Sequence, residues 1–197
     1  MAEPRNWSSK PTYLNDSTPP AANELDWPGV AACAEAPAPA GEPAVLSIEA
    51  APFDLVALVR DLSTTLTTHV NPVEVKTPLE TLIVEGDPAR LRQCLENLIA
   101  NGVQHTPDGT PVTVMLSTQH KKEGDRAVIE VIDEGPGVSP ELLPHIFDRY
   151  VSGKRASGGL GLGLYIARRV VELHGGELRV ERRTPIGSRF IVSLPLP

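Results

Sequence analysis

Amide side chains recur on one side of the segment 87–104. Asn97, Asn101 and Gln104 are spaced at helical intervals, and Gln93 extends the same stripe. The opposite side of such a helix would carry Leu91, Leu95, Leu98, Ile99 and Gly102. Asparagine is a poor helix former, so two of them one turn apart need a reason. One reading is a solvated polar face, although such faces more often carry Glu, Lys or Arg. The other is a row of carboxamide oxygens that can hold a hard cation and a water beside a polyphosphate.

A second candidate group stands at the end of an apolar strand. The segment 128–133 ends on Asp133, and a turn containing Gly135 and Gly137 follows. A carboxylate fixed there by a tight turn can accept a hydrogen bond from an exocyclic amine such as that of adenine. Taken alone the pattern is ambiguous, because Asp-x-Gly-x-Gly is also an ordinary turn composition.

A glycine-rich loop runs directly into an amphipathic helix over residues 157–167. Gly159, Gly161 and Gly163 leave backbone amides unobstructed at the start of that helix, which is the arrangement of an anion site. No Gly-Lys-Ser/Thr follows, so this is not a Walker A loop, and a polar stretch rather than a strand precedes it, unlike a Rossmann turn. The protein-kinase signatures His-Arg-Asp and Asp-Phe-Gly are absent as well.

Two kinds of periodicity predict the elements that must position these groups. Apolar spacing, capping residues and terminal glycines predict three helices, at about residues 53–70, 87–104 and 162–174. Alternating and β-branched runs predict short strands at residues 73–77, 82–84, 112–117, 127–133, 177–182 and 189–194. Because several strands follow one another directly, the order favours an α+β two-layer sandwich over a doubly wound parallel sheet. We expect a mixed sheet covered on one face by about three helices.

Composition and charge exclude several classes of protein. The 197-residue chain has 18 Lys and Arg against 25 Asp and Glu, hence a net charge of −7. An acidic chain without a Lys/Arg run gives no reason to expect nucleic acid binding. No stretch approaches the roughly 18 consecutive apolar residues of a membrane helix, and no signal peptide is visible, so we expect a cytoplasmic chain without membrane contact. Cys33 and Cys94 are too few for a disulfide framework or a cysteine-type zinc site.

The composition changes sharply near residue 45. The preceding segment holds both tryptophans and an Ala/Pro-rich stretch, with few Val, Ile or Leu. Such a segment cannot bury enough apolar area to offset the entropy lost on ordering. We therefore expect residues 1–44 to be a mostly disordered Pro/Ala-rich tail and residues 45–197 to form one domain.

The motifs also stand in a characteristic order. Between residue 46 and the C-terminus the chain resembles the catalytic and ATP-binding domain of bacterial sensor histidine kinases, with an N box at 87–106, a G1 box at 133–137, an F box at 146–150 and a G2 box at 159–164. The stretch 175–195 is similar to the closing hairpin of that family. The resemblance implies the Bergerat fold, which these kinases share with gyrase B and Hsp90.

The resemblance implies ATP and Mg²⁺ as cofactors and a role for each amide of the N box. Asn101 matches the family's Mg²⁺ ligand, and the metal would bridge the ATP phosphates. Asn97 stands where related ATPases have a general-base Glu, and a neutral side chain suits transfer to a protein acceptor better than activation of water. Asn97 and Asn101 are thus the candidate catalytic pair, while Gln104 and His105 would line the phosphate or ribose side.

The other boxes imply the rest of the nucleotide site. Asp133 would bind the adenine amino group, with Gly135 and Gly137 letting the base approach, and Phe147 of the F box would also contribute. Backbone contacts to the phosphates would come from Gly159, Leu160, Gly161, Leu162 and Gly163, and residues 148–158 would form an ATP lid. The basic residue that often follows the F-box aromatics is missing from its usual place, so its role would pass to Lys154 or Arg155.

The phosphoacceptor hairpin of a complete histidine kinase is not visible. None of the five histidines stands in the context His-Glu/Asp-x-x-Thr/Asn-Pro. The resemblance therefore implies a kinase that acts on a histidine of a separate or missing phosphoacceptor domain, with a response regulator as indirect partner in two-component signalling. Two alternatives stay open: a serine kinase of the anti-sigma-factor kind, and a nucleotide-gated binding module that transfers no phosphate.

Overall fold

The computed structural model describes residues 48–151 and 161–197. The tail expected at residues 1–44 lies outside the described residues. The elements follow in the order β1 (Ala51–Asp54), α1 (Leu55–Leu66), β2 (Val73–Lys76), β3 (Ile83–Gly86), α2 (Pro88–His105), β4 (Val112–Lys121), β5 (Gly124–Ile132), a short 3₁₀ turn (Leu143–His145), α3 (Gly163–Leu173), β6 (Glu177–Arg182) and β7 (Ser188–Pro195).

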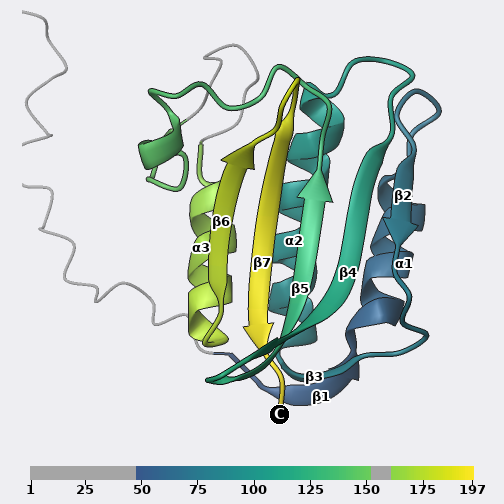
Figure 1. Cartoon of the computed structure of the whole chain (residues 1–197), viewed down its shortest axis with the longest axis vertical. Helices are drawn as coiled ribbons and strands as arrows, with labels where there is room; N and C mark the ends of the chain where they lie inside the picture. Colours follow the sequence, from purple (N-terminus) through teal and green to yellow (C-terminus); the bar gives the residue numbers. More distant parts are fainter. Residues whose placement is uncertain (1–47, 152–160) are drawn as a thin grey trace, which may run out of the picture. The chain divides into compact units, whose positions relative to one another are not determined.

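The described residues form a two-layer α/β sandwich. Its five-stranded sheet has the order β2-β4-β5-β7-β6, in which β2 runs parallel to β4 and the other neighbours are antiparallel. All three helices lie behind this sheet, and a small β1–β3 ribbon crosses the end of the domain near the C-terminus (Figure 1). The predicted mixed sheet with helices on one face is confirmed.

Alternation along the strands forms the core between the two layers. Val112, Val114 and Leu116 of β4 are buried, while the residues between them are less covered. On the helix side, Leu95 and Ile99 of α2 are fully buried against the sheet. Because apolar residues recur every 2 residues in the strands and about every 3.6 residues in α2, the apolar side chains of both layers meet in one core, as the sequence pattern predicts.

Aspartates fix where α1 and α2 begin. Asp54 Oδ1 accepts hydrogen bonds from the amides of Val56 (2.9 Å) and Leu82 (3.0 Å), so it both caps α1 and ties the start of α1 to the residue before β3. Asp87 Oδ1 accepts from the amides of Ala89 and Arg90 at the start of α2. Backbone donors, Leu82 foremost for Asp54, hold the pKa of both carboxyls below the ordinary 3.8.

The elements differ from the prediction mainly at their ends. The helix predicted over 53–70 is shorter, because Phe53 pairs with Val84 in the unpredicted strand β1 and α1 ends at Leu66. The β4–β5 hairpin is longer than predicted, since pairing continues to Lys121 opposite Gly124 through polar, exposed residues that carry no apolar alternation.

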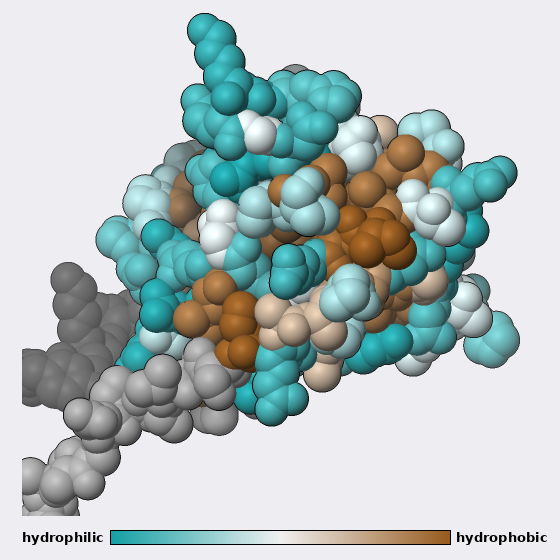
Figure 2. Space-filling model, turned by 90° about the horizontal axis from the view of Figure 1, so that it is seen from below, coloured by the Kyte–Doolittle hydropathy of each residue, from teal (hydrophilic) through white to brown (hydrophobic). Residues whose placement is uncertain are grey.

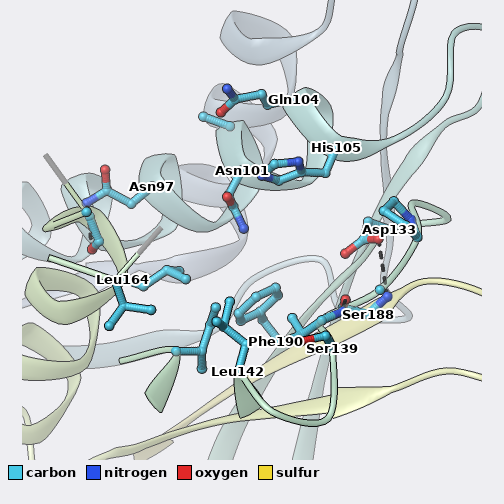
Figure 3. A pocket seen from close by; sticks show the side chains of 18 residues that line it. Asn97, Asn101, Gln104, His105, Asp133, Ser139, Leu142, Leu164, Ser188 and Phe190 are labelled. Carbon is cyan, nitrogen blue, oxygen red and sulfur yellow. Dashed lines mark hydrogen bonds between the residues drawn. The ribbon is translucent and has the colours of Figure 1, made fainter. Parts of the chain in front are cut away.

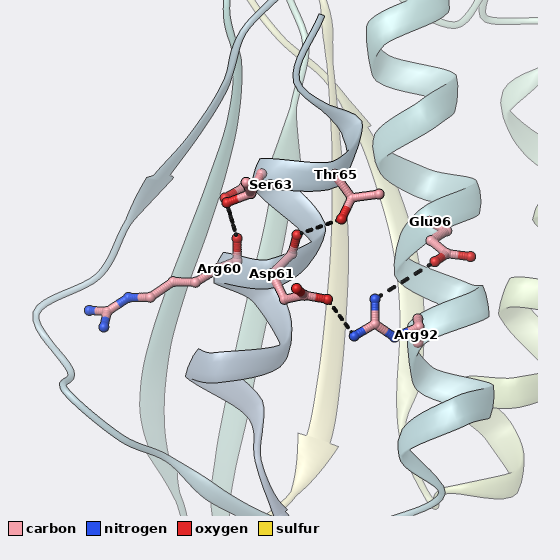
Figure 4. A network of polar contacts seen from close by, with 7 residues as sticks. Arg60, Asp61, Ser63, Thr65, Arg92 and Glu96 are labelled. Carbon is pink, nitrogen blue, oxygen red and sulfur yellow. Dashed lines mark hydrogen bonds and ion pairs between the residues drawn. The ribbon is translucent and has the colours of Figure 1, made fainter.

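An ion-pair network joins α1 to α2 on the surface. The Arg92 guanidinium of α2 lies 2.6 Å from the Asp61 carboxylate of α1 and 4.0 Å from Glu96 one turn further along its own helix (Figure 4). Ser63 and Thr65 bond back to backbone carbonyls of α1. Exposed pairs of this kind contribute little to stability, so the network chiefly orients two helices that the core already holds.

A buried asparagine fastens the loop that follows α2. The Asn71 side-chain amide donates to the carbonyl oxygens of Pro107 (2.8 Å) and Thr110 (3.0 Å) and lies 3.5 Å from that of Thr106. Because α2 carries the amide stripe, this anchor also restrains the C-terminal end of the stripe.

Among the described residues, no helix is long and apolar enough to cross a membrane. Seen from the end that carries β1 and β3, brown apolar residues are exposed between hydrophilic ones (Figure 2). Ile83 of β3, with 52% of its surface exposed, is one of the large apolar side chains left open to solvent.

Candidate nucleotide-binding site

A cavity of about 530 Å³ lies between α2, the C-terminal end of β5, the start of β7 and the N-terminus of α3. This volume falls within the range of small-molecule sites. Eight of the sequence-predicted residues line it together: Asn97, Asn101, Gln104, His105, Asp133, Gly137, Gly161 and Gly163. The structure therefore brings the N box, the G1 turn and part of the glycine-rich loop to one place (Figure 3).

Asp133 is the buried acid of this cavity. Only 5% of its surface is exposed, and its Oδ1 accepts hydrogen bonds from the amides of Gly135 (2.9 Å) and Ser188 (3.2 Å). No described protein group donates to Oδ2, which leaves that oxygen to accept from a ligand. Burial raises the pKa of Asp133 above 3.8, and the two amide donors oppose the shift.

Ser188 is a site residue that the sequence reasoning missed. Its amide binds Asp133, its carbonyl oxygen accepts from the Asp133 amide (3.0 Å), and its hydroxyl oxygen accepts from the Val138 amide (3.2 Å). The hydroxyl lies beside the carboxylate, and its hydrogen bond opposes the rise in the pKa of Asp133. The preceding Gly187 has φ +101°, and a Cβ there would clash with the Asp133 carbonyl oxygen, so only glycine permits this approach.

Apolar side chains form the wall around this acid. These side chains are Pro136, Val138, Leu142, Ile146, Val151, Leu164 and Phe190. None of them was predicted as a site residue. Phe190 follows Ser188 by two residues on β7 and therefore faces the same side of the sheet. A flat, uncharged ring system with one amine edge would fit between such walls and the free oxygen of Asp133.

The opposite side of the cavity carries the amide groups of α2. The Asn101 side chain projects from the helix into the cavity (Figure 3). The Asn97 amide donates to the Gly163 carbonyl oxygen at 3.3 Å, which joins α2 to the first residue of α3. A carboxamide cannot take up a proton at neutral pH, so neither residue can serve as a general base.

The N-terminus of α3 faces the same side. Whereas aspartates cap α1 and α2, no described side chain caps α3, whose N-cap is Leu162. Gly163 and Leu164 of its first turn line the cavity. Uncapped amides at a helix start carry partial positive charge and bind anions, so phosphate groups suit this position.

Several predicted residues lie elsewhere. Gly135 donates its backbone amide to Asp133 Oδ1, and Leu162 is the N-cap of α3. Phe147 packs its ring edge-on against Phe190, with 6.5 Å between the ring centroids. None of these three is among the lining residues. Lys154, Arg155, Gly159 and Leu160, with most of the expected lid, fall outside the described part of the chain.

The geometry thus has two chemically different ends. One end offers apolar walls and a buried acceptor, and the other offers amide groups and free helix amides. A purine nucleoside with a polyphosphate matches both ends in one molecule.

Comparison with known families agrees with this geometry. Residues 86–197, more than half of the chain, match the family described as histidine kinase-, DNA gyrase B- and HSP90-like ATPase. The matched region contains every residue of the cavity.

Curated relatives are sensor kinases. The chain is 41% identical over 123 residues to a probable sensor histidine kinase TcrY of Mycobacterium tuberculosis, covering 60% of this chain and 25% of that protein. It is 35% identical over 164 residues to the sensor protein GacS of Pseudomonas syringae, covering 77% of this chain and 18% of that protein. The chain thus spans a quarter or less of these relatives.

Solved structures of the same kind superpose on the domain. The mycobacterial sensor histidine kinase MprB gives a TM-score of 0.65 at 28% identity, covering 75% of this chain and 98% of that one. Full-length ShkA in complex with AMPPNP gives 0.63 at 29% identity, covering 78% and 32%. With the family match, these likenesses show that the chain belongs to the histidine kinase-, DNA gyrase B- and HSP90-like ATPases and contains the ATP-binding catalytic domain of a histidine kinase.

Proposed function

We propose that the cavity binds Mg-ATP and that the domain transfers the γ-phosphate to a histidine of a phosphoacceptor domain outside this chain. The observation that carries the proposal is the pairing of two features across one cavity: the free Oδ2 of buried Asp133 and the uncapped start of α3. The adenine amino group donates to Asp133, and the phosphates lie between α2 and α3.

The donor set also suits Mg²⁺ in the presence of phosphates. Asn101 supplies a neutral, hard oxygen inside the cavity, whereas no group of three or more His, Cys, Asp or Glu among the described residues could hold a metal alone. Mg²⁺ is commonly held by few protein ligands together with phosphates and waters. When bound it would neutralise charge on the transferring phosphoryl group.

The side chain of Asn97 favours a protein acceptor over water. Hydrolysis needs a base that activates water, and a carboxamide engaged with Gly163 cannot fill that role. Positioning and charge neutralisation are what this site offers, and those suffice for transfer to a nucleophile that is brought to it.

The histidines of the chain support an acceptor in another domain. His174 is buried, with Nδ1 at 2.7 Å from the Val170 carbonyl oxygen and Nε2 accepting from the Asp87 amide. His120 and His145 pair with Asp125 and Asp148, and none of the histidines stands within a helical hairpin. The acceptor domain would belong to a partner chain or to another part of a longer protein, and a response regulator would receive the phosphate from it. Because ATP is the donor, we place the reaction in the cytoplasm.

Labelling with γ-³²P-ATP and Mg²⁺ tests this function. The purified chain is incubated alone and with histidine-containing hairpin domains, and any label is treated with acid and with base. We expect acid-labile, base-stable label on the hairpin domain and none on this chain, and loss of transfer in Asn101→Ala. Acid-stable label would point instead to a serine kinase, and ATP binding without label on any candidate would point to a nucleotide-gated module.

A further inference from the structure

Two consecutive residues, Arg149 and Tyr150, hold the two ends of the turn 161–165 from which α3 begins. The Tyr150 amide donates to the Gly161 carbonyl oxygen at 3.0 Å. Tyr150 and Gly161 both have a left-handed backbone, with φ of 65° and 66° respectively. A Cβ on Gly161 would lie 2.7 Å from the Tyr150 carbonyl carbon, so the two segments are in direct backbone contact.

The side chain of Arg149 holds the other end of the turn. Its Nη2 donates to the Tyr165 hydroxyl at 2.7 Å, and its guanidinium carbon lies 4.7 Å from the centre of the Tyr165 ring. One guanidinium therefore makes a hydrogen bond and a cation–π contact to the same side chain. Two separate interactions to one partner fix its direction better than either alone.

The contacts of Arg149 and Tyr150 orient the start of α3, which no described side chain caps. Tyr165 belongs to the first helical turn, and Gly161, Gly163 and Leu164 beside it line the cavity. The Asn97 amide holds the same turn from the opposite side through the Gly163 carbonyl oxygen. Arg149 itself is exposed and is not among the lining residues.

We propose that Arg149 and Tyr165 form a clasp that positions the free amides of α3 for the phosphates of the nucleotide without touching the nucleotide. This inference rests on the proposed function, because it names the residues that set the phosphate end of that same site. Loss of the clasp leaves the base end, Asp133 and Ser188, intact.

The test compares ATP with adenosine, since only ATP reaches the phosphate end. Affinities of the full chain are measured calorimetrically with Mg²⁺ for wild type, Arg149→Ala, Tyr165→Phe and the double variant. Tyr165→Phe removes only the hydroxyl and keeps the Arg149 charge. Arg168→Ala is the matched control, because this arginine lies on the same helix but pairs with Glu172 and stacks on Phe147.

We expect each clasp variant to weaken ATP binding about three- to tenfold and to leave adenosine binding within about twofold of wild type. The double variant should bind ATP no more weakly than Arg149→Ala, because Arg149→Ala already removes both the hydrogen bond and the cation–π contact to Tyr165. Arg168→Ala should bind like wild type. A parallel loss for ATP and adenosine, additive effects, or unchanged ATP binding would each overturn the clasp while leaving the proposed function standing. A wild-type chain that binds neither molecule would overturn both.

Discussion

The buried surroundings of Asp133 disfavour the ionised form of its carboxyl group. Burial raises its pKa above 3.8, so the folded state binds the proton more tightly than the unfolded state. The free-energy cost that burial of the ionised carboxylate adds to folding is therefore absent at pH below 3.8 and grows as pH rises through the raised pKa. At neutral pH the ionised carboxylate therefore favours folding less than its neutral form would, which is typical of a group kept for binding.

Asp133→Asn separates these two effects. The new side chain retains one oxygen to accept from Gly135 and Ser188 but presents an amide NH₂ in place of the free Oδ2. We expect ATP affinity to fall by about 1.5–3 kcal/mol while the unfolding free energy at pH 7 is unchanged or higher. Calorimetry and chemical unfolding measure both quantities, with Asp125→Asn in the β4–β5 hairpin as control. Unchanged ATP affinity would show that Asp133 is not the adenine acceptor.

Burial should make the Cys94 thiol unreactive in the folded protein. Its thiol lies fully buried between α2 and α3, 3.6 Å from the Ala167 carbonyl oxygen, and burial raises its pKa to about 12. In a Cys33→Ser variant, which leaves a single thiol, we expect no reaction with a disulfide reagent at pH 8 until denaturant is added. Rapid reaction of the native variant would contradict the packing of α3 on α2.

At the scale of elements, polar contacts fix the ends of helices and apolar faces fix their place. His174 at the end of α3 accepts a hydrogen bond from the Asp87 amide at the start of α2, and its ring lies against Gly86. Asp54 likewise joins the start of α1 to the residue before β3. Each of these side chains serves two elements that are distant in sequence, so each substitution should loosen a junction rather than a single helix.

Asp54→Ala tests the junction of α1 through its pH dependence. Because the folded-state pKa lies below 3.8, the stabilisation by the carboxylate is fully present above pH 3.8 and is lost as pH falls through the folded value. We expect the variant to be about 1 kcal/mol less stable at pH 7 and the gap to close at lower pH. Urea unfolding at several pH values measures this, with Asp108→Ala in an exposed loop as control. A gap that stays constant with pH would contradict the assignment.

His174→Phe tests the junction of α2 and α3. Phenylalanine keeps a ring of similar size but accepts nothing from the Asp87 amide and donates nothing to the Val170 carbonyl oxygen. The free energy of unfolding should fall by about 1–3 kcal/mol, because two polar groups lose their partner. Replacement of the exposed His120 by Phe should change it by less than about 0.5 kcal/mol. Equal effects at the two positions would contradict the junction.

At the scale of the whole molecule, the cavity is built from elements that one hydrophobic core already packs together. α2 provides the amides, β5 and β7 provide the acid and its neighbours, and α3 provides the free helix start. A ligand that touches all of them binds only the folded arrangement. Nucleotide binding should therefore stabilise the domain by mass action.

Thermal unfolding checks this coupling. ATP with Mg²⁺ at about 100 times its Kd should add about 2.7 kcal/mol and raise Tm by about 5–10 °C. GTP should raise it far less, because guanine presents a carbonyl where adenine presents its amine and so repels the Asp133 carboxylate. Far-UV circular dichroism gives the transition. Equal shifts with ATP and GTP would show that the base is not read by Asp133.

Much of the site was predictable because its signals are local. The amides of α2 follow the period of the helix, Asp133 stands at the end of a strand, and the glycines precede a helix, so each group could be placed on its element from neighbouring residues, whereas its role was implied only by the order of the motifs. The strand β1 was missed, because its four residues carry little alternation and owe their conformation to pairing with β3.

The sequence by itself, with the family resemblance it carries, thus predicted polar groups that line the cavity and the sandwich of helices and a mixed sheet on which they stand. The tertiary structure decided which groups surround them. Ser188 meets Asp133 across 55 residues, and Arg149 meets Tyr165 across 16 residues. Such contacts follow from strand register and helix docking, and these depend on burial summed over the whole core rather than on any local spacing.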